Sequence, residues 1–327
     1  MIRIHAEVVE WPLEEPFTIS RGTMTAVEGL LVTLLDGDGN RGRGEAYGII
    51  YEGENPQTML AQIRDARGQI EAGTSREELL AILPSGGARC AVDCAMWDLE
   101  AKAGGWTVAG HIGVAPARGV DTAFTIGMRA PGAMEATARR FADHALLKVK
   151  VDTGRPIEML EEVSRGAPNA KLIVDPNQSW TIDHLNRFMD DLQRLNVVLL
   201  EQPLPIDGDE GLRGYKSPIP ICADELIHDR ADLPKAEGKY QVINIKLDKA
   251  GGLTEGMALA REARELGYGL MVGCMAGSSL AMAPAHMVAQ LCDFVDLDGP
   301  LLQSADWPHA LRYERGVVSP PSQDLWG

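Results

Sequence analysis

Charged side chains recur in this sequence where apolar segments end. Three acidic residues each follow an apolar run directly: Asp175, Glu201 and Asp224. Lys150 precedes this series and Lys246 follows it, and the successive intervals from Lys150 to Lys246 are 25, 26, 23 and 22 residues. A strand, a loop, a helix and a return loop need about this length. Because the strands of repeated βα units are parallel, we expect all five side chains at one end of one barrel.

The three carboxylates are candidate metal ligands. Gathered at one barrel mouth they would repel one another unless a cation neutralised them. Oxygen ligands of this type suit Mg²⁺ best and Mn²⁺ next, and the sequence has no His-x-x-x-His or Cys-x-x-Cys pair of the zinc-binding type. Each acid taken alone is better explained as a helix N-cap or a solvated loop residue. Their positions on successive strands favour the metal site.

The lysines are candidate acid/base groups. Lys148 and Lys150 alternate with Val149, so both should point from one strand face into the barrel, where Leu or Val is the usual residue. Burial of two cations is unfavourable without a purpose. A neighbouring cation and a metal would favour neutral Lys150, which could then abstract a proton. Lys246 ends the sixth expected strand, opposite the second, so a substrate carbon between them would meet one lysine on each face. The alternative is that the lysines only pair with the acids.

The elements that must position these residues fall into two parts. Up to about residue 115, alternation at 2–9, 29–35 and 41–46 predicts an antiparallel meander, and 56–71 and 88–102 read as helices. From residue 120 the pattern alternates between strand and helix. The eight expected strands are 122–126, 146–150, 172–175, 197–201, 219–223, 242–246, 270–272 and 294–297. We predict a closed parallel α/β barrel behind a small α+β cap, with an open doubly wound sheet as the structural alternative.

Composition narrows the class of protein further. The 327 residues are 45% hydrophobic and 24% charged, with a net charge of −16 that argues against nucleic-acid binding. No leader-like start and no long apolar run is present, so we expect a cytoplasmic protein that does not enter a membrane. The five cysteines fit a reducing compartment, and Cys90 and Cys94 read as core residues of one helix. The sequence leaves a homo-oligomer open.

The Lys-x-Lys pair, the Asp, Glu, Asp series and the opposed lysine resemble the enolase superfamily, in its muconate lactonizing enzyme subgroup, over essentially the whole chain. Longer segments are similar to dipeptide epimerases acting on L-Ala-D/L-Glu; they include Pro16-Phe-Thr-Ile-Ser-Arg21-Gly22, Leu200-Glu-Gln-Pro-Leu-Pro205, Asn244-Ile-Lys-Leu-Asp-Lys-Ala-Gly-Gly-Leu-Thr254, Gly273-Cys-Met275 and Asp296-Leu-Asp-Gly-Pro300. The resemblance implies a TIM-type (β/α)7β barrel at 116–300. An α+β capping domain at 1–115 would be completed by the C-terminal segment 301–327.

The resemblance also implies roles for individual residues. An isomerase of this family exchanges the substrate's α-proton by two-base 1,1-proton transfer through an enediolate, which Mg²⁺ stabilises. The catalytic lysines would be Lys150 and Lys246, and the metal ligands Asp175, Glu201 and Asp224. Substrate contacts would come from Lys148 to the terminal carboxylate, from Asp296 and Asp298 to the dipeptide's ammonium, from Arg21 to the glutamate side chain, and from Thr125, Cys274 and Met275.

Two other functions remain open. One is a different reaction within the superfamily, such as that of o-succinylbenzoate synthase or N-acylamino acid racemase. The other is a non-catalytic, metal-dependent binder of small acids. Asp296 and Asp298 favour a dipeptide as the small-molecule partner, because acylated or succinylated substrates carry no ammonium to neutralise two acids. Two opposed lysines favour an enzyme over a binder.

Overall fold

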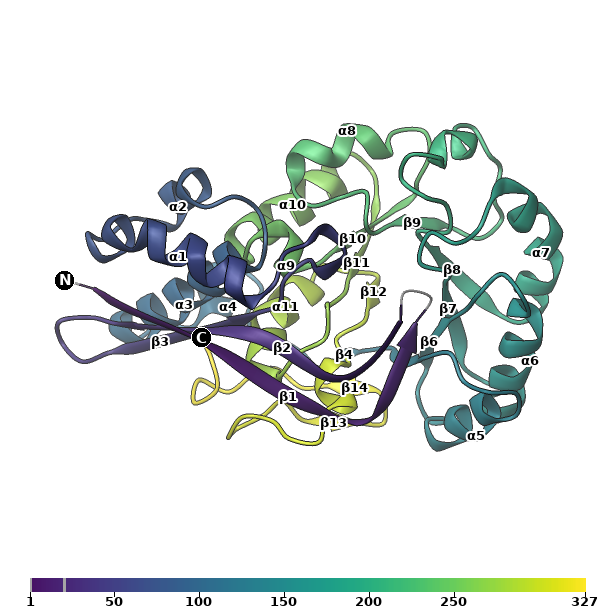
Figure 1. The fold of residues 1–327 in the computed structure, drawn as a ribbon, viewed down its shortest axis with the longest axis horizontal. Helices are drawn as coiled ribbons and strands as arrows, with labels where there is room; N and C mark the ends of the chain where they lie inside the picture. Colours follow the sequence, from purple (N-terminus) through teal and green to yellow (C-terminus); the bar gives the residue numbers. More distant parts are fainter. Residues whose placement is uncertain (1, 20–21) are drawn as a thin grey trace.

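The N-terminal part is the predicted antiparallel meander followed by helices. The computed structural model describes residues 2–19 and 22–327 (Figure 1). Strands β1 (Arg3–Ile19), β2 (Gly22–Leu35) and β3 (Arg41–Ala46) pair in that order. The first two strands are longer than predicted, because they continue pairing beyond an irregularity between Pro12 and Phe17, where hydrophobic alternation is poor. The following helices are η1 (Ile50–Glu52), α1 (Pro56–Glu71), α2 (Arg76–Ile82), α3 (Gly87–Gly104) and α4 (Val108–His111), of which α2 was not predicted.

The second part is a sheet of eight parallel strands whose spatial order follows the sequence. Its strands are β5 (Phe124–Ile126), β6 (Leu146–Lys150), β7 (Lys171–Asp175), β8 (Val197–Glu201), β9 (Ile221–Ala223), β10 (Val242–Ile245), β11 (Gly269–Val272) and β12 (Phe294–Val295). The sheet curls until its edges meet, since Ala123 N donates to Val295 O at 2.8 Å. This confirms the predicted barrel. The open doubly wound alternative is wrong, because that fold requires a reversal of strand order within the sheet.

Helices cover the outside of the barrel (Figure 1). They are α5 (Ala133–Arg140), α6 (Pro156–Gly166), α7 (Ile182–Arg194), α8 (Leu233–Ala236), α10 (Leu253–Glu265) and α11 (Ser279–Ala289), with short 3₁₀ turns η2 (Asp209–Leu212), η3 (Arg230–Asp232) and η4 (Gly299–Leu302). The short helix α9 (Leu247–Ala250) is buried and packs against α3 of the cap. Helix α7 illustrates the local logic: Thr181 caps its first turn, and its buried residues Leu185, Phe188, Met189 and Leu192 recur at helical spacing. None of the described helices is long and apolar enough to cross a membrane.

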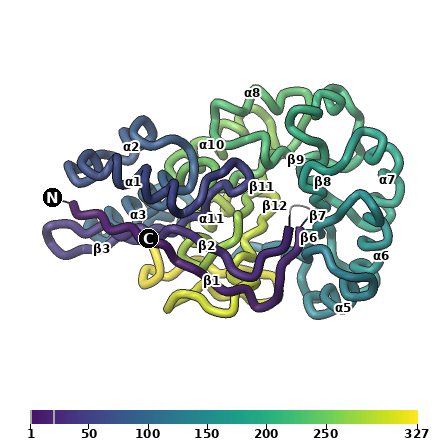
Figure 2. The backbone as a smooth tube through the Cα atoms, in the orientation of Figure 1, coloured from purple at the N-terminus to yellow at the C-terminus, as the bar shows by residue number. Residues whose placement is uncertain are grey.

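The C-terminal segment returns to the cap, where both chain ends lie (Figure 2). It pairs β13 (Tyr313–Glu314) and β14 (Val317–Val318) with β4 (Val120–Asp121). The Trp326 indole then donates to Cys94 O at 3.0 Å, and Gly327 N donates to Asp98 Oδ1 at 2.7 Å. Cys90 and Cys94 are buried thiols of α3. The proposed domain limits near 115 and 300 stay a prediction.

The hairpin of β1 and β2 reaches from the cap across the barrel mouth (Figure 2). Specific contacts fix it against the first barrel unit. Met128 N donates to Thr18 O at 2.9 Å, and Glu15 forms ion pairs with Arg129 at 2.8 Å and Arg140 at 3.2 Å. These contacts hold the hairpin over the carboxyl ends of the barrel strands, the end where βα barrels carry their sites.

Candidate active site

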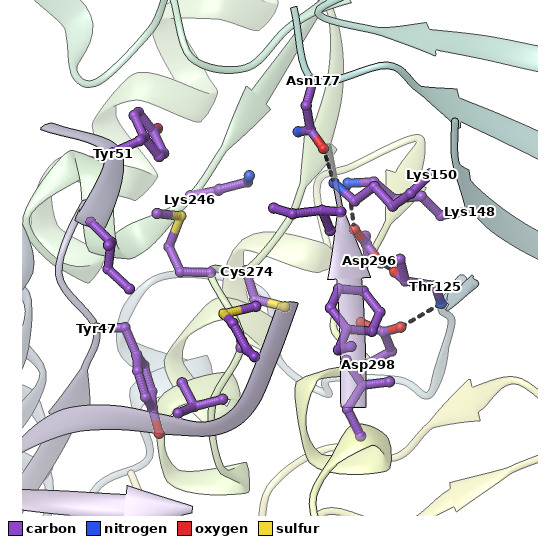
Figure 3. A pocket seen from close by; sticks show the side chains of 18 of the residues that line it. Tyr47, Tyr51, Thr125, Lys148, Lys150, Asn177, Lys246, Cys274, Asp296 and Asp298 are labelled. Carbon is purple, nitrogen blue, oxygen red and sulfur yellow. Dashed lines mark hydrogen bonds and ion pairs between the residues drawn. The ribbon is translucent and has the colours of Figure 1, made fainter. Parts of the chain in front are cut away.

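A cavity of about 440 Å³ lies between the cap and the carboxyl ends of the barrel strands (Figure 3). Cap residues including Leu13, Phe17, Met24 and Tyr51 give it an apolar wall. The barrel side supplies most of the predicted residues, namely Thr125, Lys148, Lys150, Asp224, Lys246, Cys274, Met275, Asp296 and Asp298. Asp175 and Glu201 are 1% and 0% exposed and do not line the cavity. Arg21 lies outside the described residues.

Lys148 lies among four carboxylates. Its Nζ is 2.7 Å from Glu201 Oε2, 2.9 Å from Asp296 Oδ2 and 3.3 Å from Asp175 Oδ2. Burial opposes the charged form, but the attraction of Asp296, Glu201, Asp175 and Asp224 outweighs it and raises the pKa of Lys148 well above its usual value. Lys148 is therefore a fixed cation at the centre of the site.

Lys150 and Lys246 lie on opposite sides of the cavity (Figure 3). Strands β6 and β10, which carry or precede them, are four places apart in the eight-stranded order. Lys150 Nζ contacts Asp175 Oδ2 at 2.5 Å and Asn177 Oδ1 at 3.1 Å. Lys246 Nζ contacts Asp224 Oδ2 at 2.6 Å. One expectation needs correction: β10 ends at Ile245, so Lys246 is the first residue beyond the strand and precedes α9.

The three acids are buried, and their pKa values are shifted in different directions. Although burial disfavours the charged form, Lys150 and Lys148 hold the pKa of Asp175 at about 2. Against the same effect of burial, Lys246 and Lys249 hold the pKa of Asp224 well below its usual value. For Glu201, burial dominates the attraction of Lys148 and raises its pKa to about 8. A further positive charge beside Glu201 would favour its ionised form.

The donor chemistry of these acids fits a hard divalent cation. All three offer carboxylate oxygens, and Glu201 Oε2 is buried without a hydrogen bond, its 2.7 Å contact with Lys148 being an ion pair of unfavourable hydrogen-bond geometry. Lysine ammonium groups lie between the acids, so no three acidic, His or Cys side chains of the described ranges stand close enough together to coordinate one ion as arranged. The ligand assignment therefore rests on donor type and burial.

The Asp-x-Asp pair lines the cavity beside Lys148, but it does not lie on a strand. The eighth strand was expected at 294–297, with Asp296 on it, whereas β12 ends at Val295. The chain leaves the sheet because Leu297 N donates to the Thr122 hydroxyl in place of a backbone carbonyl. Both acids nevertheless face the cavity, and both contact Thr125: its N–H donates to Asp298 Oδ2 at 2.5 Å and its hydroxyl to Asp296 Oδ1 at 3.2 Å (Figure 3).

Three further polar residues were not predicted as site residues. Asn177 contacts Lys150, Asn244 Nδ2 donates to Glu201 Oε1 at 3.0 Å, and Lys249 Nζ contacts Asp224 Oδ1 at 2.7 Å. Asn244 could have been predicted from the sequence: it precedes Lys246 by two residues in the expected strand 242–246, so the two side chains were expected on the same face. Lys249 had no such signal, because it follows the strand on a helical turn.

Two family models match the chain. Residues 1–113 match the mandelate racemase/muconate lactonizing enzyme N-terminal domain, and residues 133–324 match the enolase C-terminal domain-like family. The chain belongs to the enolase superfamily. The N-terminal match covers the cap and the C-terminal match covers most of the barrel, so the superfamily assignment extends over both halves of the cavity.

Two of the curated relatives differ in their activity. The chain is 41% identical over 310 residues to the L-Ala-D/L-Glu epimerase of Escherichia coli K12. The alignment covers 94% of this chain and 96% of that protein. It is 45% identical over 250 residues to an N-acetyl-D-glutamate racemase of a Pseudoalteromonas species, which covers 76% of this chain and 79% of that protein. The two relatives differ in what the amino group of their substrates carries.

Solved structures of superfamily members agree with the fold. A crystal structure of an enolase family member from Agrobacterium tumefaciens, with bound sodium and L-Ala-L-Glu, has a TM-score of 0.97 and 40% identity and covers 100% of both chains. A dipeptide epimerase of Methylococcus capsulatus complexed with Mg and L-Arg-D-Lys has a TM-score of 0.90 and 29% identity, and it covers 98% of this chain and 97% of that chain.

Proposed function

We propose that this enolase superfamily protein is a Mg²⁺-dependent dipeptide epimerase that inverts the α-carbon of the second residue of L-Ala-D/L-Glu. The observation that carries the proposal is the arrangement of Lys150 and Lys246 on opposite sides of one cavity that Asp296 and Asp298 also line. A binder of small acids would need cations, but it would have no use for two lysines facing one carbon. The named epimerase relative and the dipeptide-bound structures support the same assignment.

In this proposal the residues of the chain divide the work of one proton exchange. One of Lys150 and Lys246 removes the α-proton, and the other delivers a proton to the opposite face; the reverse reaction exchanges their roles. Lys148 stays charged and attracts the substrate's terminal carboxylate. Asp175, Glu201 and Asp224 would hold Mg²⁺. When bound, the ion supplies positive charge beside that carboxylate and so makes the weakly acidic α-proton removable.

Substrate orientation follows from the wall that carries Lys148, Asp296 and Asp298. Lys148 would bind the substrate's carboxylate and Asp298 its ammonium, with Asp296 in contact with Lys148 (Figure 3). Because Asp296 already pairs with Lys148 at 2.9 Å, Asp298 is the acid left for an ammonium group. Arg21 would pair with the glutamate side chain. The five free thiols suit a reducing compartment, which supports a cytoplasmic location.

A second candidate function is racemisation of N-acylated glutamate. It is favoured by the Pseudoalteromonas relative and by one feature of the site. Burial, together with the charge of Asp296, raises the pKa of Asp298 to about 7. A protonated Asp298 could donate a hydrogen bond to an acyl oxygen, whereas an ionised one suits an ammonium.

Proton NMR in D₂O tests both candidates directly. The protein with Mg²⁺ is incubated with L-Ala-L-Glu or with N-acetyl-L-Glu, and loss of the glutamate α-proton is followed together with appearance of the D epimer. Exchange and inversion of the dipeptide alone support epimerisation. Turnover of N-acetyl-L-Glu alone would assign the second function. Exchange of neither substrate would contradict both proposals.

A further inference from the structure

Gln202 follows the proposed ligand Glu201 directly, and its side chain uses every hydrogen-bonding position it has. It is 0% exposed. Its Oε1 accepts from Asp224 N at 3.0 Å and from Leu226 N at 3.3 Å. Its Nε2 donates to Leu204 O at 3.1 Å and to the Tyr240 hydroxyl at 2.7 Å. A primary amide has two donors and two lone pairs, so all four positions are occupied.

These hydrogen bonds connect the chain segments after β8 and β9, beyond the last residue pair of the two strands. The pairing of β8 with β9 ends at Glu201 and Cys222, and Gln202 N still donates to Cys222 O at 2.8 Å. Beyond Cys222, the next bond between the two segments comes from the buried N–H of Asp224, which donates to the side-chain oxygen of Gln202. A buried N–H without an acceptor is costly. The amide therefore ties the backbone of Asp224 to the backbone that carries Glu201.

The backbone conformation of Gln202 and the contacts of its partner Tyr240 show that surrounding residues hold the Gln202 side chain in place. Gln202 has φ +32, outside the usual range for a residue with a side chain. Such conformations persist where surrounding contacts determine them. On the outer side, the Tyr240 hydroxyl donates to Asp209 Oδ2 at 2.9 Å, and Lys239 Nζ contacts Asp209 Oδ1 at 2.6 Å. The buried ion pair of Lys239 and Asp209 thus fixes the Tyr240 hydroxyl that accepts from the Gln202 amide.

We propose that Gln202 is a positioning residue of the metal site, which fixes the backbone of Asp224 relative to Glu201 so that both carboxylates can bind one cation. Asp224 is held at its side chain by Lys249 and at its backbone by Gln202. The inference rests on the proposed Mg²⁺ binding. Groups that orient metal ligands in this way typically contribute 10- to 100-fold to metal affinity.

Calorimetric titration of Mg²⁺ into the metal-free protein measures this contribution without relying on turnover. Gln202→Met keeps the length of the side chain and removes all four bonds, and we expect about 10- to 100-fold weaker binding. Tyr240→Phe removes one acceptor of Gln202, and we expect a smaller loss, roughly 3- to 10-fold, on the same scale. Gln290→Met is the matched control: Gln290 also bridges backbone groups, at Arg118 N and O, but it lies away from the cavity. Its affinity for Mg²⁺ should equal that of the wild type.

The outcomes separate this inference from the proposed function. If the wild type binds Mg²⁺ and Gln202→Met binds it within twofold, the positioning role is wrong while the function stands. Equal loss in Gln202→Met and Gln290→Met would also overturn it, since general destabilisation would then explain both. If Gln202→Met does not fold, unchanged affinity in Tyr240→Phe overturns the inference. Absence of Mg²⁺ binding by the wild type would remove the function and the inference together.

Discussion

Lys150 and Asp175 are direct partners across adjacent barrel strands, and their charged ends touch. The register of β6 and β7 pairs the two residues, and Lys150 Nζ lies 2.5 Å from Asp175 Oδ2. The proposed base and a proposed ligand therefore determine each other's position. Because they share one contact, we expect substitutions of the two to be non-additive in their effect on activity.

Metal removal should abolish turnover. Excess chelator should stop exchange of the α-proton, and Mg²⁺ should restore it, whereas Zn²⁺ should restore it poorly because three carboxylates suit a hard cation. The measurement is the initial rate of α-proton exchange in L-Ala-L-Glu by NMR. Undiminished exchange in excess chelator would show that Asp175, Glu201 and Asp224 serve another purpose.

Removal of one opposed lysine should separate proton exchange from inversion. Lys150→Ala should lose epimerisation but keep exchange of the α-proton of one epimer through Lys246. Lys246→Ala should keep exchange of the other epimer. Deuterium incorporation into L-Ala-L-Glu and L-Ala-D-Glu is measured separately for each variant. The same epimer exchanging in both variants would mean that the two lysines do not face opposite sides of the carbon.

Asp298 should matter for substrates with a free amino group. Asp298→Asn removes the negative charge expected beside the ammonium, so kcat/KM for L-Ala-L-Glu should fall. The fall should correspond to a loss of about 1.5 to 3 kcal/mol in transition-state stabilisation, the scale of a charged hydrogen bond. For N-acetyl-L-Glu the variant should be no worse than the wild type. Equal losses for the two substrates would indicate that Asp298 mainly supports the turn through Thr125 N.

Arg21 should select an acidic second residue. Arg21→Ala should lower kcat/KM for L-Ala-L-Glu by an amount that corresponds to about 1.5 to 3 kcal/mol of transition-state stabilisation. The loss should be much smaller for L-Ala-L-Leu, because only glutamate offers a side-chain carboxylate to the guanidinium. The wild type should strongly prefer the glutamate dipeptide. A uniform loss with both dipeptides would assign Arg21 a structural role.

His286 should make stability depend on acid pH. This histidine of α11 is 0% exposed, and burial lowers its pKa to about 4 from about 6.5. Since the folded protein favours the neutral form, its contribution to stability is complete above pH 6.5 and is lost as the pH falls toward 4. The full shift corresponds to about 3 kcal/mol. His286→Leu should therefore lose less stability than the wild type between pH 7 and pH 4.5.

Urea unfolding at the two pH values measures this difference. Other groups also titrate in this range, so the informative quantity is the change in pH dependence between variant and wild type. His309→Gln is the control, because His309 is exposed and should leave the pH dependence as it is. Identical pH dependence in His286→Leu and the wild type would contradict the prediction.

The sequence by itself determined the barrel and the residues at its mouth. Apolar runs such as 197–200 are long enough for one strand, and their regular spacing implies parallel units whose polar ends coincide. Lys148 and Lys150 were placed correctly on β6 because side chains alternate along any strand. Strand limits were less secure: β9 begins at Ile221 and not at residue 219, consistent with Pro220, which has no N–H to donate to a ladder.

Only the tertiary structure decided which of these groups touch. Lys148 meets Glu201 and Asp296, which are 53 and 148 residues away, because the sheet curls until β5 and β12 meet. Local patterns carry the direction of a side chain along its own strand but not the curvature that brings distant strands together. The same limit hid the contact of Gln202 with the Asp224 backbone, which depends on the offset between β8 and β9 at the point where their pairing ends.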